Sequence, residues 1–154
     1  MHNHLAELHP MIIHFPIVLF VAYFLVEFSN LFFKQTLVDG INFIILLAGV
    51  LFSIVSVLTG NQAQNSVLPI MHSKPIELVK ILELHETMAT ITLWLFTIIL
   101  FVRYYLFSKN KLNQIWKIII TIIAFVGVIL VYETALLGGK LVYEYGVGTK
   151  FFTK

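Results

Sequence analysis

The chain has 154 residues, of which 59% are hydrophobic and 12% are charged, and it contains no cysteine. Charged residues usually make up about a quarter of a water-soluble domain, so this composition excludes a soluble globular protein and predicts one that uses lipid as its solvent. The lack of cysteine excludes disulfides, thiolate metal sites and c-type haem attachment. A formal net charge of +2 gives no reason to expect a nucleic-acid partner.

Four stretches are apolar over roughly the 20 residues that a helix needs to cross a bilayer. They are residues 11–33, 41–59, 85–107 and 115–137. Short polar segments join the first to the second and the third to the fourth, so each pair is expected to form an antiparallel hairpin. Residues 75–84 have apolar and charged positions at helical spacing and predict a surface helix that runs into the third span. The predicted fold is all-α, an integral membrane four-helix bundle with up-down-up-down topology, in a single domain over residues 1–154.

The basic residues predict the orientation of the bundle. Arg103, Lys109, Lys111 and Lys117 surround the turn between the third and fourth spans, whereas the basic residues of the other face are spread over longer segments among acidic ones. Basic residues close to span ends mark the cytoplasmic side. We therefore expect a multi-pass protein of the bacterial cytoplasmic (inner) membrane with both termini outside.

The histidines and methionines all fall at one end of the predicted bundle. They are His2, His4, His9, His14, His72 and His85, with Met1, Met11, Met71 and Met88. Imidazole and thioether groups gathered at one membrane face are typical ligands of a metal or a haem. This face is therefore where a site is expected.

The N-terminal motif HPMIIHFP occupies residues 9–16. Pro10 suits a first helical position, which makes His9 the predicted cap of the first span and places His14 about one turn inside the membrane. Five residues separate the two rings by about 140° around the helix axis, so we expect them to serve different partners.

The leading hypothesis for this end is a b-type haem held between His14 and His85, because a four-helix bundle can place two imidazoles on opposite faces of a flat macrocycle. Glu133 lies about one turn inside the outer end of the fourth span, beside Tyr132. Glu133, Tyr132 or His9 would then bond a propionate or tune the potential. All these residues share one depth, so the protein would act as a surface-side electron relay, for a periplasmic c-type cytochrome or a quinol.

Two alternatives remain open. Cu(I) or another metal would suit the imidazoles His9, His14 and His85 together with thioethers, and it predicts a second group of ligands on the same face. That group is Met11, Met71, His72 and Met88. The other alternative is a structural subunit without a cofactor, in a homo-oligomer or larger membrane complex. The chain lacks the Gly-x-Ser-x-Gly, P-loop and Gly-x-Gly-x-x-Gly motifs, which favours a binding or electron-transfer protein over an enzyme.

Small residues predict where the helices pack. Gly49, Ser53, Ser56 and Gly60 recur every three or four residues along the second span, and such a stripe lets another helix approach closely. We interpret it as a helix contact. The later segment Gly146-Val-Gly148 lacks the strand and the third glycine of a dinucleotide site and is interpreted as a turn.

Several motifs together resemble a known family. They are HPMIIHFP at the start, Thr59-Gly60 at the end of the second span, His85 opening the third, and GGKLVYEYGVG over residues 138–148. Their order and spacing resemble the bacterial membrane family of domain of unknown function two-two-three-one (DUF2231). Its members are similar four-helix membrane proteins, and the domain also occurs fused to c-type cytochrome modules, so the resemblance implies a link to electron transfer. The matching positions are His9, His14, His85, Gly138 and Gly139, whereas family members often have histidine where this chain has Tyr145.

Overall fold

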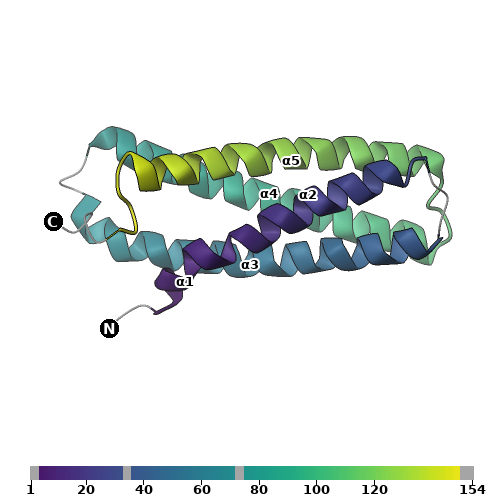
Figure 1. Ribbon diagram of the computed structural model, residues 1–154, viewed down its shortest axis with the longest axis horizontal. Coiled ribbons are helices and arrows are strands. Elements are labelled where there is room, and N and C mark those ends of the chain that lie inside the picture. Colours follow the sequence, from purple (N-terminus) through teal and green to yellow (C-terminus); the bar gives the residue numbers. More distant parts are fainter. Residues whose placement is uncertain (1–3, 33–35, 72–74, 150–154) are drawn as a thin grey trace.

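The computed structural model describes residues 4–32, 36–71 and 75–149, and this part of the chain forms five helices (Figure 1). The helices are α1 (His4–Ile12), α2 (His14–Ser29), α3 (Thr36–Met71), α4 (Ile76–Ser108) and α5 (Gln114–Tyr143). α2 and α3 form one antiparallel hairpin, and α4 and α5 form the other. The predicted all-α bundle with up-down-up-down topology is confirmed.

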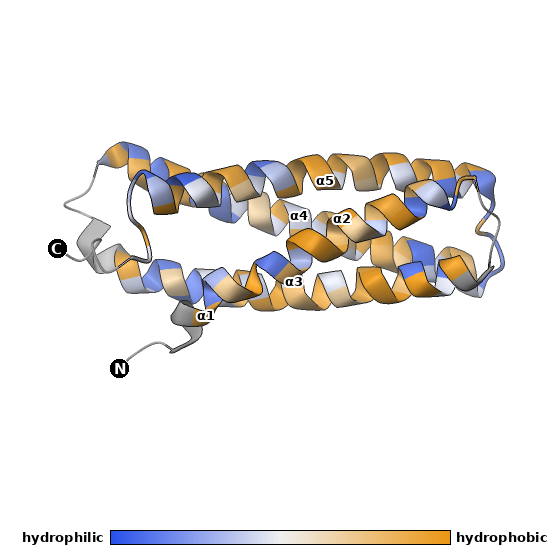
Figure 2. Ribbon diagram, in the orientation of Figure 1, coloured by the Kyte–Doolittle hydropathy of each residue, from blue (hydrophilic) through white to orange (hydrophobic). Residues whose placement is uncertain are grey.

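Four segments are long and apolar enough to cross a membrane. They are Leu8–Ser29, Val38–Val67, Ile76–Ser108 and Gln114–Tyr143. Hydrophobic residues dominate the length of the bundle, whereas hydrophilic residues gather towards its two ends (Figure 2). Large apolar side chains remain exposed on every span, which is the pattern expected of helices that are solvated by lipid. The chain is therefore a multi-pass membrane protein.

The two ends of the bundle differ in chemistry. At one end α2 and α4 begin and α3 and α5 finish, and we call it the histidine end because it carries His9, His14 and His85. The opposite end holds the two hairpin connections, and we call it the turn end. Between them lies an apolar core in which Phe20 and Phe96 stack with ring centroids 3.8 Å apart.

The second and third spans extend further than their apolar runs predicted. α3 continues from the predicted end at residue 59 to Met71, and the predicted surface helix at 75–84 is the first part of the continuous helix α4. A helix of 36 residues is about 54 Å long, against a hydrocarbon core of about 30 Å. Polar residues such as Asn61 and Gln64 therefore do not end α3, since a helix can continue into water beyond the lipid.

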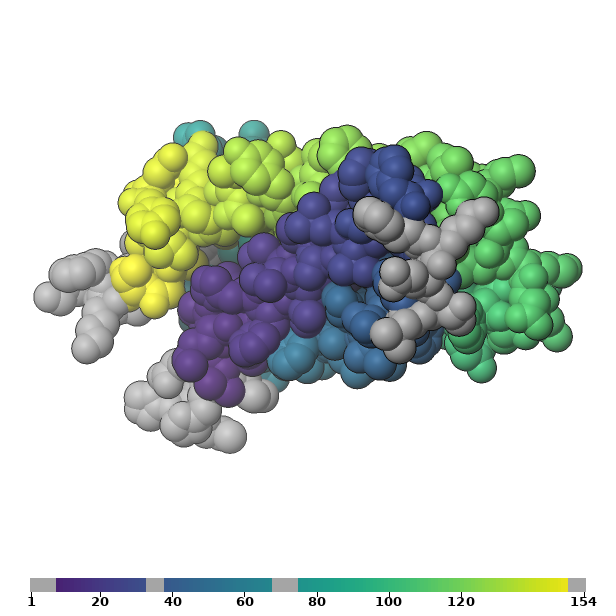
Figure 3. Space-filling view, turned by 45° about the vertical axis from the view of Figure 1, so that its right-hand side comes forward, coloured from purple at the N-terminus to yellow at the C-terminus, as the bar shows by residue number. Residues whose placement is uncertain are grey.

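The first helix begins earlier than predicted and is interrupted before the first span ends. α1 begins at His4, so His9 is not the cap of the first span and Pro10 lies inside α1. The break falls at Ile13, between α1 and α2, and Pro16 follows three residues later. Pro16 has no N–H to bond the carbonyl of the preceding turn, which weakens the helix at this point. α1 and α2 cross one face of the bundle diagonally, next to the C-terminal segment (Figure 3).

The end of α5 folds back over the histidine end. The N–H of Gly146 donates to the carbonyl of Val142 at 3.0 Å, and that of Val147 donates to the carbonyl of Leu141 at 2.9 Å. Gly146 has a positive φ of 70°, and its bond to the carbonyl of Val142 is the αL ending of a helix. Val147 then packs against the buried Leu141. The prediction that Gly146-Val-Gly148 forms a turn is confirmed.

Candidate functional site

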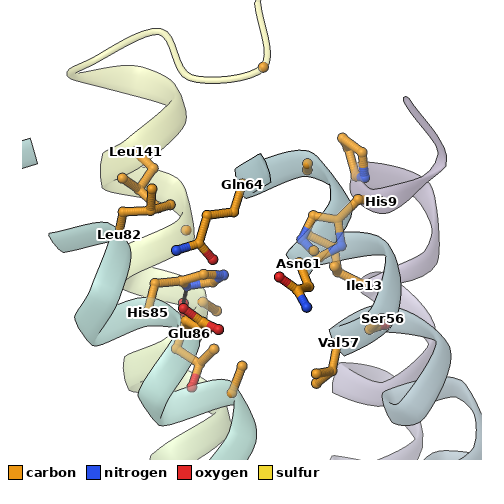
Figure 4. Close-up of a pocket in the computed structure, with 18 of the residues that line it drawn as sticks. His9, Ile13, Ser56, Val57, Asn61, Gln64, Leu82, His85, Glu86 and Leu141 are labelled. Atoms are coloured by element: carbon orange, nitrogen blue, oxygen red, sulfur yellow. Dashed lines mark hydrogen bonds between the residues drawn. The ribbon is translucent and has the colours of Figure 1, made fainter. Parts of the chain in front are cut away.

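A cavity of about 780 Å³ opens between the helices at the histidine end (Figure 4). Its lining comes from α1 to α5 and from the turn that follows α5. His9 projects into it from α1 and His85 from α4, on opposite walls (Figure 4). Cavities that bind small molecules or cofactors are about 300–1,000 Å³ in volume, so this one is large enough to hold either.

His85 is held in one orientation by the backbone of α5. Its Nδ1 lies 3.0 Å from the carbonyl oxygen of Thr134. A carbonyl can only accept, so Nδ1 must carry the proton and the other ring nitrogen, Nε2, keeps a free lone pair. Gly138 makes room for the ring, because a Cβ at that position would lie 3.1 Å from the His85 Cε1.

His9 is held in the same way by α3. Its Nδ1 lies 3.1 Å from the hydroxyl oxygen of Thr59. That hydroxyl has a single proton, for which the carbonyls of Val55 and Ser56 compete at 2.9 and 3.0 Å, so its oxygen accepts from His9. Gly60 makes room for this ring, since a Cβ there would lie 2.9 Å from the His9 Cε1.

Each imidazole therefore offers an unprotonated Nε2 and has its Nδ1 hydrogen-bonded to a helix. Histidines that bind a metal almost always donate the other ring N–H in this way, because the bond fixes the tautomer and makes the ligand nitrogen more basic. Both rings are half-buried at the wall of the same cavity. The arrangement suits two neutral imidazole ligands that share one bound group.

The rest of the lining is amphipathic. Phe20 and Val131 are buried apolar residues of the inner part, whereas Asn61 and Glu86 have solvent-exposed side chains. The Ser56 hydroxyl is buried and has no hydrogen-bond partner within the described residues. A ligand with an apolar body and a polar edge would match both parts of this surface.

The structure does not bring together all the residues that the sequence analysis grouped. His14 is exposed and does not line the cavity, so the residue opposite His85 is His9. Glu133 is also exposed and Tyr132 is 60% exposed, and neither lines the cavity. The His85 ring instead bonds the backbone carbonyl of Thr134, which follows Glu133 directly in the chain and lines the cavity.

Met11 and Met88 are also absent from the cavity lining. Met11 is 68% exposed. His72 lies outside the described residues, and the side chain of Met71 is likewise not described. Within residues 4–32, 36–71 and 75–149 no three histidine or carboxylate side chains form a cluster that would hold a metal ion.

A second polar site, near the turn end, was missed by the sequence analysis. Arg103 is 1% exposed and donates to Glu27 at 2.5 Å and to Asp39 at 2.9 Å. Lys117 binds the other oxygen of Asp39 at 3.1 Å, and Asn42 donates to Glu27. The sequence signal was Glu27, a carboxylate inside an apolar run, since such a residue needs a partner. Arg103 and Lys117 belong to the basic group that predicts the orientation of the bundle, and both are engaged in these ion pairs.

The fold and the sites define a polytopic four-helix membrane protein with a histidine-lined cavity at one end and a buried ion-pair network near the other. A known family, described as "Predicted membrane protein (DUF2231)", matches residues 6–151. The chain belongs to this family, as its motifs predicted. Comparisons with curated proteins and with solved structures found no match.

Proposed function

We propose that this protein binds a b-type haem in the cavity at the histidine end, with His9 and His85 as axial ligands, and that it transfers electrons at that face of the membrane. The observation that carries the proposal is the matched pair of imidazoles, each with Nδ1 bound to a helix oxygen and Nε2 free at a common cavity. A haem iron is commonly held by one or two such nitrogens.

The donor set suits a haem better than a bare metal ion. A porphyrin supplies four nitrogens itself and needs two more ligands, which is the number of histidines on the cavity walls. The amphipathic lining fits a group with an apolar macrocycle and two polar propionates. The copper alternative draws less support, since the described methionines lie outside the cavity lining.

The bound haem would supply one-electron chemistry, and the chain would control it through ligand basicity and access. The Thr134 carbonyl and the Thr59 hydroxyl would increase the electron donation of their imidazoles by hydrogen bonding to Nδ1. Phe20, whose ring stacks on that of Phe96, lines the cavity. Both ligands lie at one end, so electrons would be exchanged at this face, with a quinol or a c-type cytochrome as the proposed partner.

The test is to express the protein with haem supplied, purify it in mild detergent and record oxidised and reduced spectra. The parent is expected to show a Soret band and a low-spin bis-imidazole spectrum. His9→Ala and His85→Ala should each lose the low-spin spectrum, because each removes one axial ligand. His14→Ala is the matched control, since His14 is at the same end but exposed, and it should behave like the parent.

Two results would overturn the proposal. A parent protein that folds and remains colourless with haem supplied would exclude haem binding and favour a structural role. Loss of the low-spin spectrum in His14→Ala, with His9→Ala unaffected, would restore His14 as the ligand and exclude His9.

A further inference from the structure

We infer that the chain consists of two equivalent helical hairpins related by a pseudo-twofold axis along the bundle, and that the group bound at the histidine end lies on this axis between two equivalent imidazoles. The second clause rests on the proposed function. The first clause, that the two hairpins are equivalent, is independent of the proposed function and is supported by sequence positions, packing and charge.

The key residues of the two hairpins recur at constant spacings. His9 and Phe20 of the first hairpin correspond to His85 and Phe96, each 76 residues later. On the returning helices, glycines correspond at a spacing of 78 residues. The pairs are Gly49 with Gly127 and Gly60 with Gly138.

The same two spacings, 76 and 78 residues, also relate the buried positions of the helices in one hairpin to those in the other. On α2 and α4, the equivalent buried positions are Pro16 with Thr92, Phe20 with Phe96, Tyr23 with Ile99, and Glu27 with Arg103. On α3 and α5 they are Asn42 with Ile120, Leu46 with Ala124, Gly49 with Gly127, and Ser53 with Val131. Each helix of one hairpin therefore turns the same face inward as its counterpart.

The contacts inside the hairpins are also repeated. A Cβ at Gly49 would meet the Phe20 ring at 2.8 Å, and a Cβ at Gly127 would meet the Phe96 ring at 2.6 Å. Eleven residues further along each of these helices, Gly60 accommodates His9 in the way that Gly138 accommodates His85. Each hairpin thus fits a phenylalanine and a histidine of its first helix against two glycines of its second.

Equivalent residues of the two hairpins contact each other at several levels along the bundle, as expected of residues beside a twofold axis. Phe20 stacks on Phe96 with an angle of 5° between the rings. Glu27 pairs with its counterpart Arg103, and Asp39 pairs with its counterpart Lys117. Two parallel repeats about an axis along the membrane normal are a known plan of membrane proteins.

The charges explain why the two equivalent hairpins differ in sequence where they face each other. Identical residues at these self-facing positions would place like charges together in a buried site, which is strongly unfavourable. Each position instead carries an acid in the first hairpin and a base in the second. The cavity is thus an interface between equivalent halves, and each half contributes one imidazole.

The first test exchanges the charges between the halves. The fourfold variant Glu27→Arg, Asp39→Lys, Arg103→Glu and Lys117→Asp restores every ion pair with its direction reversed. The neighbouring Asn42 amide can serve either charge because it both donates and accepts. We expect this variant to be monodisperse in detergent, with a melting temperature close to that of the parent.

The control exchanges Glu27 and Arg103 alone, which leaves the new carboxylate at position 103 beside Asp39. This double variant should aggregate or melt far below the parent. If the fourfold variant is no more stable than the double variant, the two halves are not equivalent and the inference is overturned, whether or not the protein binds haem.

The second test addresses the ligand. With haem supplied, His9→Ala and His85→Ala should give the same altered spectrum, and added imidazole should restore the low-spin form of both at concentrations equal within about threefold. A coloured parent in which one of these variants keeps the low-spin spectrum, or in which the two concentrations differ by roughly tenfold or more, would overturn equivalence while leaving haem binding intact. A colourless parent would overturn the proposed function and the clause that rests on it, and the charge exchange would still decide the symmetry.

Discussion

At the scale of single residues, the two histidines of the cavity depend on glycine and threonine partners that are not themselves typical ligand residues. Gly60 and Gly138 leave the space that the His9 and His85 rings occupy. The oxygen of Thr59 and the carbonyl of Thr134 then fix the rings through Nδ1. Each histidine therefore depends on a glycine beside its ring and on a threonine oxygen that accepts from Nδ1. Of these three positions, only the histidine is recognisable as a ligand in the sequence.

This dependence predicts that Gly138→Leu displaces the His85 ring, because a Cβ there already lies 3.1 Å from the His85 Cε1. Haem binding, measured as Soret absorbance per protein, should fall to the level of His85→Ala. The neighbouring Gly139→Leu is the matched control, since the nearest atom to its Cβ is 4.0 Å away on Tyr143. Equal loss in both variants would show that the effect is a general one on the helix.

The buried ion pairs predict a large stability effect. Arg103→Met leaves Glu27 and Asp39 without their main cation and should lower the free energy of unfolding by about 3–5 kcal/mol. The double variant Glu27→Gln with Arg103→Met should recover part of this loss, because it also removes the uncompensated carboxylate. Unfolding of the purified protein in detergent measures both.

The control for these variants is Lys109→Met, which changes an exposed basic residue near the same end. It is expected to change stability by less than about 0.5 kcal/mol. A loss for Arg103→Met no greater than that for Lys109→Met would contradict the view that the network holds the spans together.

At the scale of elements, the turn after α5 is part of the cavity and not only a chain terminus. Val147, Gly148 and Thr149 line the cavity, and the backbone bonds of Gly146 to Val142 and of Val147 to Leu141 bring them there. The motif that looked like a simple turn thus supplies one of the walls of the site. Its glycines at φ of 70° and 79° are required by the backbone.

Gly146→Ala should accordingly lower stability by about 1–2 kcal/mol, the cost of a left-handed conformation for a residue with a side chain. Cleavage after the end of α5 by a protease should become faster as the turn opens. Gly139→Ala is a suitable comparison, because Gly139 is helical and alanine favours a helix by about 1 kcal/mol. If both variants are equally stable, the turn does not depend on its glycine.

The helix boundaries could be predicted less well than the spans. Four spans and two hairpins could be predicted, since an apolar run of about 20 residues is characteristic of a helix that crosses a membrane. The continuation of α3 from residue 59 to Met71 could not, because a polar helix in water and a polar loop have similar compositions. The predicted start of the first helix is wrong, because Pro10, a residue that favours the first helical position, lies inside α1.

At the scale of the whole molecule, the orientation in the membrane remains a prediction. Arg103 and Lys117 are paired with acids, so exposed Lys109 and Lys111 provide the basic density near the turn between α4 and α5. Both termini are expected outside. Reporter fusions at Asn110 and Lys154 should report cytoplasmic and external locations respectively. A cytoplasmic reporter at Lys154 would place the histidine end on the inner face and exclude a periplasmic electron partner.

Composition, the length of the apolar runs and the length of the connections were enough to predict that lipid solvates this protein. They also predicted its four spans, the pairing of those spans into hairpins and the end at which its histidines gather. The folded bundle was needed to show that His9 and not His14 lies opposite His85, and that Glu27 meets Arg103 and Asp39 meets Lys117. These contacts depend on the rotation of each helix about its own axis. That rotation is set by how side chains of all four spans pack together, and residues 76 or 78 positions apart come into contact only when the bundle has formed.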